Sequence, residues 1–72
     1  MRDKQAKFME LAENRVNRAL NDIRLIGNLA NRNNYDYSEE QAQKILAVLE
    51  GEIKSLKSKF QAEIQKRREF KF

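Results

Sequence analysis

The side chains that could carry chemistry in this 72-residue chain are amides, carboxylates, ammonium groups and guanidinium groups, because histidine, cysteine and tryptophan are absent. Without imidazole or thiolate, the chain lacks the ordinary ligands for zinc or haem and the ordinary activated nucleophiles. The acidic residues Glu10, Glu13, Glu50 and Glu52 do not form the Glu-x-x-His pairs of a di-iron bundle. We therefore predict a protein that is not an enzyme, with no catalytic residue, metal site or cofactor, whose chemistry is binding.

The asparagines are the most unusual group, since all of them fall between residues 14 and 34. Most of them, with one arginine, repeat at spacings of three and four residues, which places them on one face of a helix. We call this series the asparagine stripe: Asn14, Asn17, Asn21, Arg24, Asn28 and Asn31. A short amide can donate and accept hydrogen bonds to a base edge, a phosphate or a partner's backbone. Asparagine is a poor helix former, which favours a binding role, with an ordinary solvent-exposed face as the alternative.

The carboxyl-terminal end of the chain is basic. Residues 54–72 hold seven basic residues against Glu63 and Glu69, a balance of +5 in a chain whose net charge is +4. The basic residues are Lys54, Lys57, Lys59, Lys66, Arg67, Arg68 and Lys71. Interleaved with Phe70 and Phe72, they are suited to neutralising phosphates and stacking on bases, or to shallow insertion at a membrane surface. The alternative is a favourable interaction of cations with a helix carboxyl terminus.

Residues 31–38 form the only break between two segments of helical periodicity, and they predict a turn. Asparagines suit this position because they tolerate left-handed backbone and form local hydrogen bonds. Ser38 and Gln41 have the spacing of a capping box, and Tyr37 can pack on Ala42 as a hydrophobic staple. Because Tyr37 has that structural role, the candidate contact residues of the turn are Arg32 and Tyr35.

The two segments beside the turn predict helices over about residues 4–30 and 39–69. In the first, the apolar seam is Met9, Ala12, Val16, Ala19, Ile23, Ile26 and Ala30, widened by Phe8, Leu11, Leu20 and Leu29. In the second, the seam is Ala42, Leu46, Leu49, Ile53, Leu56 and Phe60, flanked by Ile45, Val48 and Ile64. Gly27 lies beside the first seam, where a neighbouring helix could approach closely. Gly51 lies opposite the second seam and could bend or divide that helix.

This pattern predicts an all-α fold, an antiparallel two-helix hairpin, as one domain of residues 1–72. The apolar stripes are wider than two helices can cover, so a second copy or another partner must bury the surplus. Twofold association is the commonest arrangement of soluble oligomers, which favours a homodimeric four-helix bundle. The expected oligomer interface consists of Val16, Leu20, Ile23, Ile26, Leu46, Leu49, Ile53 and Leu56. No apolar run is long enough to span a bilayer, and Met1-Arg2-Asp3-Lys4 leads into an amphipathic helix, so we expect a cytoplasmic protein.

The segment from Arg24 to Arg32, continuing through residues 35–40, resembles short uncharacterised prokaryotic or phage helical-hairpin proteins, a resemblance that implies no activity. In length and layout the chain is also similar to the Rop family of plasmid-encoded, RNA-binding helical hairpins, which dimerise into four-helix bundles. No motif matches that family residue by residue. The similarity is therefore architectural, and architecture alone does not transfer function.

Three binding roles follow from these features. The first is a small regulatory module that holds nucleic acid, with RNA ranked before DNA by the resemblance to Rop, through the basic end and the Asn/Arg face. Its expected contacts are Lys57, Lys59, Lys66, Arg67, Arg68, Lys71, Asn14, Asn17, Asn21, Arg24, Asn28, Arg32 and Tyr35. The alternative is a protein-interaction module, such as a phage-type inhibitor or assembly adaptor, that docks its helices on a larger protein. A membrane-surface role of the basic tail ranks third.

Overall fold

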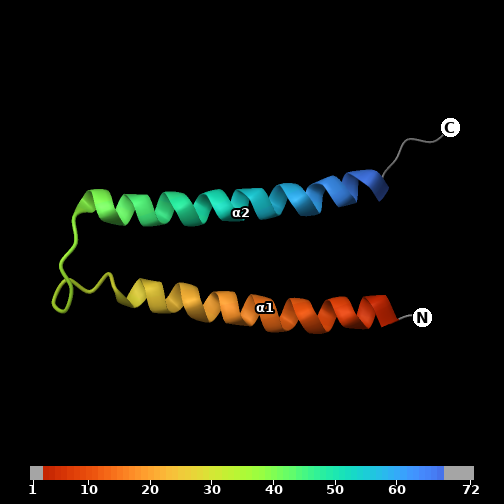
Figure 1. The fold of residues 1–72 in the computed structure, drawn as a ribbon, viewed down its shortest axis with the longest axis horizontal. Coiled ribbons are helices and arrows are strands. Elements are labelled where there is room, and N and C mark those ends of the chain that lie inside the picture. The colour runs from red at the N-terminus through yellow and green to blue at the C-terminus, as the bar shows by residue number, and fades with distance from the viewer. Residues whose placement is uncertain (1–2, 68–72) are drawn as a thin grey trace. The chain divides into compact units, whose positions relative to one another are not determined.

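The computed structural model describes residues 3–67, and this part of the chain is all-helical, with two α-helices and no strand (Figure 1). Helix α1 spans Asp3–Asn28 and helix α2 spans Glu39–Arg67. The chain divides between Asp36 and Tyr37 into two units, each built around one helix. The predicted all-α class is thus confirmed, and the two-helix order fits a helical hairpin.

Helix α1 ends two residues before the limit expected from its apolar pattern. The amides of Leu29, Ala30 and Asn31 donate to the carbonyls three residues earlier, at 3.0, 3.1 and 3.5 Å. Such tighter bonds commonly close the last turn of a helix. Ala30 therefore follows α1 rather than belonging to its regular seam, although its spacing matches the pattern.

The turn after α1 is organised by Asn31. The side-chain Oδ1 of Asn31 accepts the amide of Asn33 at 2.9 Å, and its carbonyl accepts the amides of Asn34 and Tyr35 at 3.1 and 3.0 Å. The expected local hydrogen bonding by asparagine is confirmed. The turn makes no use of the tolerance of asparagine for left-handed backbone, because no residue in the described range has a positive φ. Asn31 holds the turn through its side chain and carbonyl, so the backbone stays in ordinary conformations.

Helix α2 begins with the predicted capping box. The amide of Gln41 donates to Ser38 Oγ at 3.0 Å, and the amide of Ser38 donates to Gln41 Oε1 at 2.8 Å. Two amides that a helix start leaves without backbone partners are therefore satisfied reciprocally. Tyr37 and Ala42, the two residues of the expected staple, are both half-buried in a largely exposed chain. Glu39 and Glu40 add negative charge to the first turn, where the helix dipole favours it.

Helix α2 continues without interruption through Gly51, so the possibility that this glycine divides the segment is excluded. A glycine in a helix interior costs stability but does not break the hydrogen-bond ladder, and the chain contains no proline. The helix extends as far as Arg67. The last residues of the predicted helix, 68 and 69, lie outside the described range.

Neither helix has a core of its own. No side chain described in residues 3–66 is buried, and the large apolar residues of both seams remain between 41% and 60% exposed, apart from the half-buried Leu11, Ile26 and Leu49. In a single helix, only the preceding and following turns can cover a side chain from solvent. Both apolar stripes are therefore surfaces that remain to be covered.

Candidate binding surfaces of the two helices

Helix α1 carries its apolar seam and its asparagine stripe on opposite sides. With about 100° between successive residues, the seam centres near the direction of Ala12 and the stripe centres near that of Asn28, roughly 160° away. Asn14, Asn17, Asn21, Arg24 and Asn28 are all helical and all exposed. They fall within an arc of roughly 80° and extend over about 21 Å of the helix axis. The structure thus brings these five predicted residues together on one surface.

Asn31 is the exception in the stripe. It lies beyond the end of α1, and its Oδ1 is occupied by the amide of Asn33. The spacing of Asn31 extends the stripe only if the helix continues to residue 31. Because the helix ends at Asn28, Asn31 has a structural role in the turn, and the stripe ends with Asn28.

Two apolar residues lie outside the apolar faces of the helices. The sequence pattern did not include Leu25 in any surface, and it placed Val48 beside the α2 seam. Leu25 is 56% exposed and lies at the edge of the asparagine stripe, roughly 140° from the centre of the seam. Val48 is 60% exposed and lies roughly 120° from the centre of the α2 seam, rather than flanking it as expected. The position of each residue around the helix axis, rather than its proximity in sequence to seam residues, shows that both lie outside the apolar faces.

Helix α2 presents one apolar face bordered by charges of both signs. The face holds Ala42, Ile45, Leu46, Leu49, Ile53, Leu56, Phe60 and Ile64, all within roughly 100° of arc. Glu50 and Lys57 lie on one border, and Glu52 and Lys59 lie on the other. All four charged residues are exposed. The positions bordering an apolar seam are those from which charged side chains reach across to a neighbouring helix.

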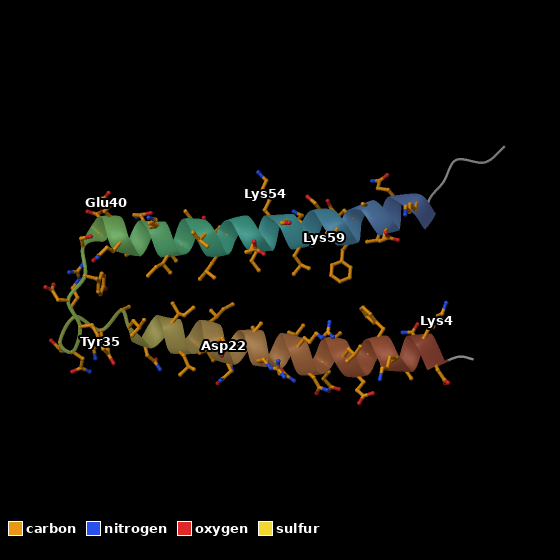
Figure 2. All side chains as sticks on the ribbon, viewed as in Figure 1. Lys4, Asp22, Tyr35, Glu40, Lys54 and Lys59 are labelled. Atoms are coloured by element: carbon orange, nitrogen blue, oxygen red, sulfur yellow. The ribbon has the colours of Figure 1, made fainter. Side chains whose placement is uncertain are left out.

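The basic residues of α2 surround the helix instead of forming a single patch. Lys54 and Lys57 lie on one side of the apolar face, and Lys59 and Lys66 lie on the other; Figure 2 shows Lys54 extending from the upper edge of α2. Lys66 Nζ lies 3.6 Å from Glu63 Oε2 in an exposed pair. Arg67 is the last helical residue of the described range. Arg68 and Lys71, also predicted as contacts, lie outside that range.

The turn adds two candidate residues to the first unit. Tyr35 is about half exposed, and its amide donates to the carbonyl of Asn31 at 3.0 Å, which fixes the backbone that carries the ring (Figure 2). Arg32 is exposed. These two residues and the asparagine stripe belong to the unit of α1, whereas the predicted lysine contacts belong to the unit of α2.

Across residues 3–67, no group of three or more acidic side chains is arranged to hold a metal ion. Over the same range, neither helix is long and apolar enough to cross a membrane. Comparison with protein-family models, curated proteins and solved structures finds no match to this chain.

Proposed function

We propose that the protein is a non-catalytic helical hairpin that pairs with a second copy into a four-helix bundle and acts as a regulatory nucleic-acid-binding module. The self-association is supported by the exposed apolar faces of α1 and α2. Apolar surface of this extent is normally covered in a soluble protein. One antiparallel neighbour covers only part of each stripe, and a twofold-related copy supplies the remainder.

The observation that carries the binding role is the opposition of the two sides of α1. If the apolar seam turns toward the bundle, then Asn14, Asn17, Asn21, Arg24 and Asn28 all face outward. Helix propensity favours Glu, Lys or Gln at such positions, so repeated asparagine requires another explanation. Amide groups placed along about 21 Å of helix can contact successive base edges and backbone groups of a nucleic acid.

The basic end of α2 supplies the electrostatic part of the proposal. Lys57, Lys59 and Lys66 are exposed, and Arg67, Arg68 and Lys71 extend the same basic sequence. Phosphate contacts by such residues raise affinity for any nucleic acid without reading its sequence. In this division of roles, the basic end provides affinity and the asparagine stripe provides selection. RNA ranks before DNA on the layout that the chain shares with the Rop family.

The second candidate is a protein-interaction module that docks its helices on a larger protein. It is favoured by the same exposed apolar faces, and by Leu25, which places an apolar side chain beside the asparagine stripe. A mixed surface of this kind is typical of protein interfaces. In this case the larger protein, rather than a second copy, covers the seams of α1 and α2.

A salt titration of binding separates the two functions. Fluorescence anisotropy of labelled RNA and DNA oligonucleotides would be measured for the wild type and for a variant with Lys66, Arg67 and Arg68 changed to Gln. If three phosphate contacts are lost, the slope of log Kd against log salt concentration should fall by about 2 to 3. All oligonucleotides should be weakened alike, because phosphates carry no sequence information.

The matched control changes Lys4, Lys7 and Arg15 of α1 to Gln, which removes the same net charge from the other helix. We expect this control to keep most of the salt slope. Equal slopes for the two variants would show that binding follows net charge alone. No measurable binding of either nucleic acid by the wild type would remove this function and leave the docking role.

A further inference from the structure

The charges of α2 change sign along the helix. Residues 39–53 contain Glu39, Glu40, Glu50 and Glu52 against Lys44, a net charge of −3. Residues 54–67 contain Lys54, Lys57, Lys59, Lys66 and Arg67 against Glu63, a net charge of +4. Two parallel copies of this helix would align like charges, whereas two antiparallel copies align opposite charges along their length.

The same reversal occurs in detail along the borders of the apolar face. Glu50 and Lys57 are one heptad apart on one border, and Glu52 and Lys59 are one heptad apart on the other. The structure records no ion pair between any of these four side chains and another described residue, and all four are exposed. Each border thus holds an acid and a base at the interval that an antiparallel copy of the same helix would match.

We propose that α2 packs antiparallel against α2 of a second copy, an inference that rests on the self-association proposed above. The twofold axis lies near residues 54 and 55. In this register Leu49 packs at the level of the partner's Phe60, and Ile53 packs at the level of the partner's Leu56. Every contact occurs twice, because a twofold interface is self-complementary.

The borders complete this register with ion pairs. Glu50 reaches the partner's Lys57 on one side of the seam, and Glu52 reaches the partner's Lys59 on the other. With the symmetry-related pairs, four acid–base contacts flank one apolar seam. In a parallel, in-register pair, each border of the apolar face meets the opposite border of the partner. Glu52 then reaches the partner's Lys57, and Glu50 has no basic partner. The antiparallel arrangement therefore satisfies all four charged positions, and it places the turns of the two chains at opposite ends of the bundle.

Spin-label distances test the direction of packing. The chain has no cysteine, so Gln43→Cys and Gln61→Cys each give a single labelling site, and both residues lie on the same side of the apolar face. In the antiparallel register, the two labels at residue 43 are about 35 Å apart along the axis, and those at residue 61 are about 20 Å apart. A parallel pair places the two labels at the same level at both positions, so the distances at residues 43 and 61 are equal and depend only on the width of the helix pair.

Double electron–electron resonance on each labelled protein measures these distances, with sedimentation of the same samples. A dimer with a longer distance at residue 43 than at residue 61 supports the proposal. A dimer with equal short distances overturns the antiparallel packing but leaves the proposed self-association intact. A folded monomer at all concentrations removes the self-association and the packing together.

Charge variants test the border contacts. Glu50→Lys with Glu52→Lys makes all four of these border positions basic, and we expect dimerisation to weaken at least about tenfold as four attractions become repulsions. Adding Lys57→Glu and Lys59→Glu to the same chain restores opposite charges and should recover wild-type affinity. Lysine and glutamate have similar helix propensities, so helicity is retained.

The matched control for the charge variants lies on α1. Glu10→Lys with Glu13→Lys makes the same change in net charge away from the α2 borders, and it should leave dimerisation within about threefold of the wild type. Equal weakening by the α1 and α2 variants, or no recovery in the fourfold variant, would overturn the assigned ion pairs.

Discussion

Gly51 offers a direct test of which side of α2 remains exposed. A methyl group built at this position meets no atom within 4 Å, and the residue lies opposite the apolar face, roughly 180° from its centre. Replacing an interior helical glycine with alanine removes the conformational cost of glycine without adding a clash. We therefore expect Gly51→Ala to stabilise the protein.

The expected gain is about 0.5–1 kcal/mol per chain, the usual difference between glycine and alanine within a helix. For a domain of this size, 1 kcal/mol shifts the melting temperature by about 4–8 °C, so the expected rise is roughly 2–8 °C. Thermal unfolding followed by circular dichroism at 222 nm, at one fixed protein concentration, measures the shift. The concentration must be held constant because association contributes to the stability of the folded state.

Gly27→Ala is the matched comparison. Gly27 also has open space around it in the chain, but it lies beside the α1 seam and one residue before the end of the helix. A methyl group there gains little helix stability and blocks close approach of a neighbouring helix, which typically costs about 1–3 kcal/mol. We expect Gly27→Ala to lower the melting temperature while Gly51→Ala raises it. A loss of stability in Gly51→Ala would refute the assignment of that side of α2 as solvent-exposed.

Three further results are expected. Ser38→Ala should destabilise α2 by about 1 kcal/mol, because the amide of Gln41 loses its acceptor at 3.0 Å. Ser38→Asp should retain most of the stability. Urea unfolding of the two variants measures the difference. The double variant Asn17→Ala with Asn21→Ala should be as stable as the wild type, or more stable by a few tenths of a kcal/mol per site. It should also discriminate less between preferred and unrelated oligonucleotides. Full selectivity in this variant would show that the stripe is an ordinary solvent-exposed face. Sedimentation equilibrium should show at least a dimer at micromolar concentration, and Leu49→Asp should give a poorly folded monomer because it places a charge in the proposed seam.

The features that the sequence predicted well are those decided by neighbouring residues. Ser38 and Gln41 form their capping box from chemistry contained in four consecutive positions, so no distant part of the chain can alter it. The continuity of α2 through Gly51 follows likewise from the unbroken phase of the apolar residues on either side. The asparagine stripe was predictable as far as Asn28, because helical periodicity alone places its members.

The errors arose where periodicity and hydrogen bonding disagree. Ala30 and Asn31 continue the spacing of α1, but the side chain of Asn31 accepts the amide of Asn33 and closes a turn instead. The spacing of residues shows which of them would share a face if the helix continued, but it does not show where the helix ends. Leu25 escaped notice for a related reason, since it lies next to seam residues in sequence yet on another side of the helix.

The capping box makes nucleation of α2 easier than nucleation of α1 in the unfolded chain. Nucleating a helix is unfavourable by about a thousandfold in equilibrium constant, and Ser38 with Gln41 lowers that barrier by satisfying two amides at the first turn of α2. Each contact in the box joins residues three apart, so its formation requires neither the other helix nor a second copy. We therefore expect α2 to form before α1, and a hydrogen-exchange pulse during refolding should show early amide protection just after Ser38 that spreads toward Gly51.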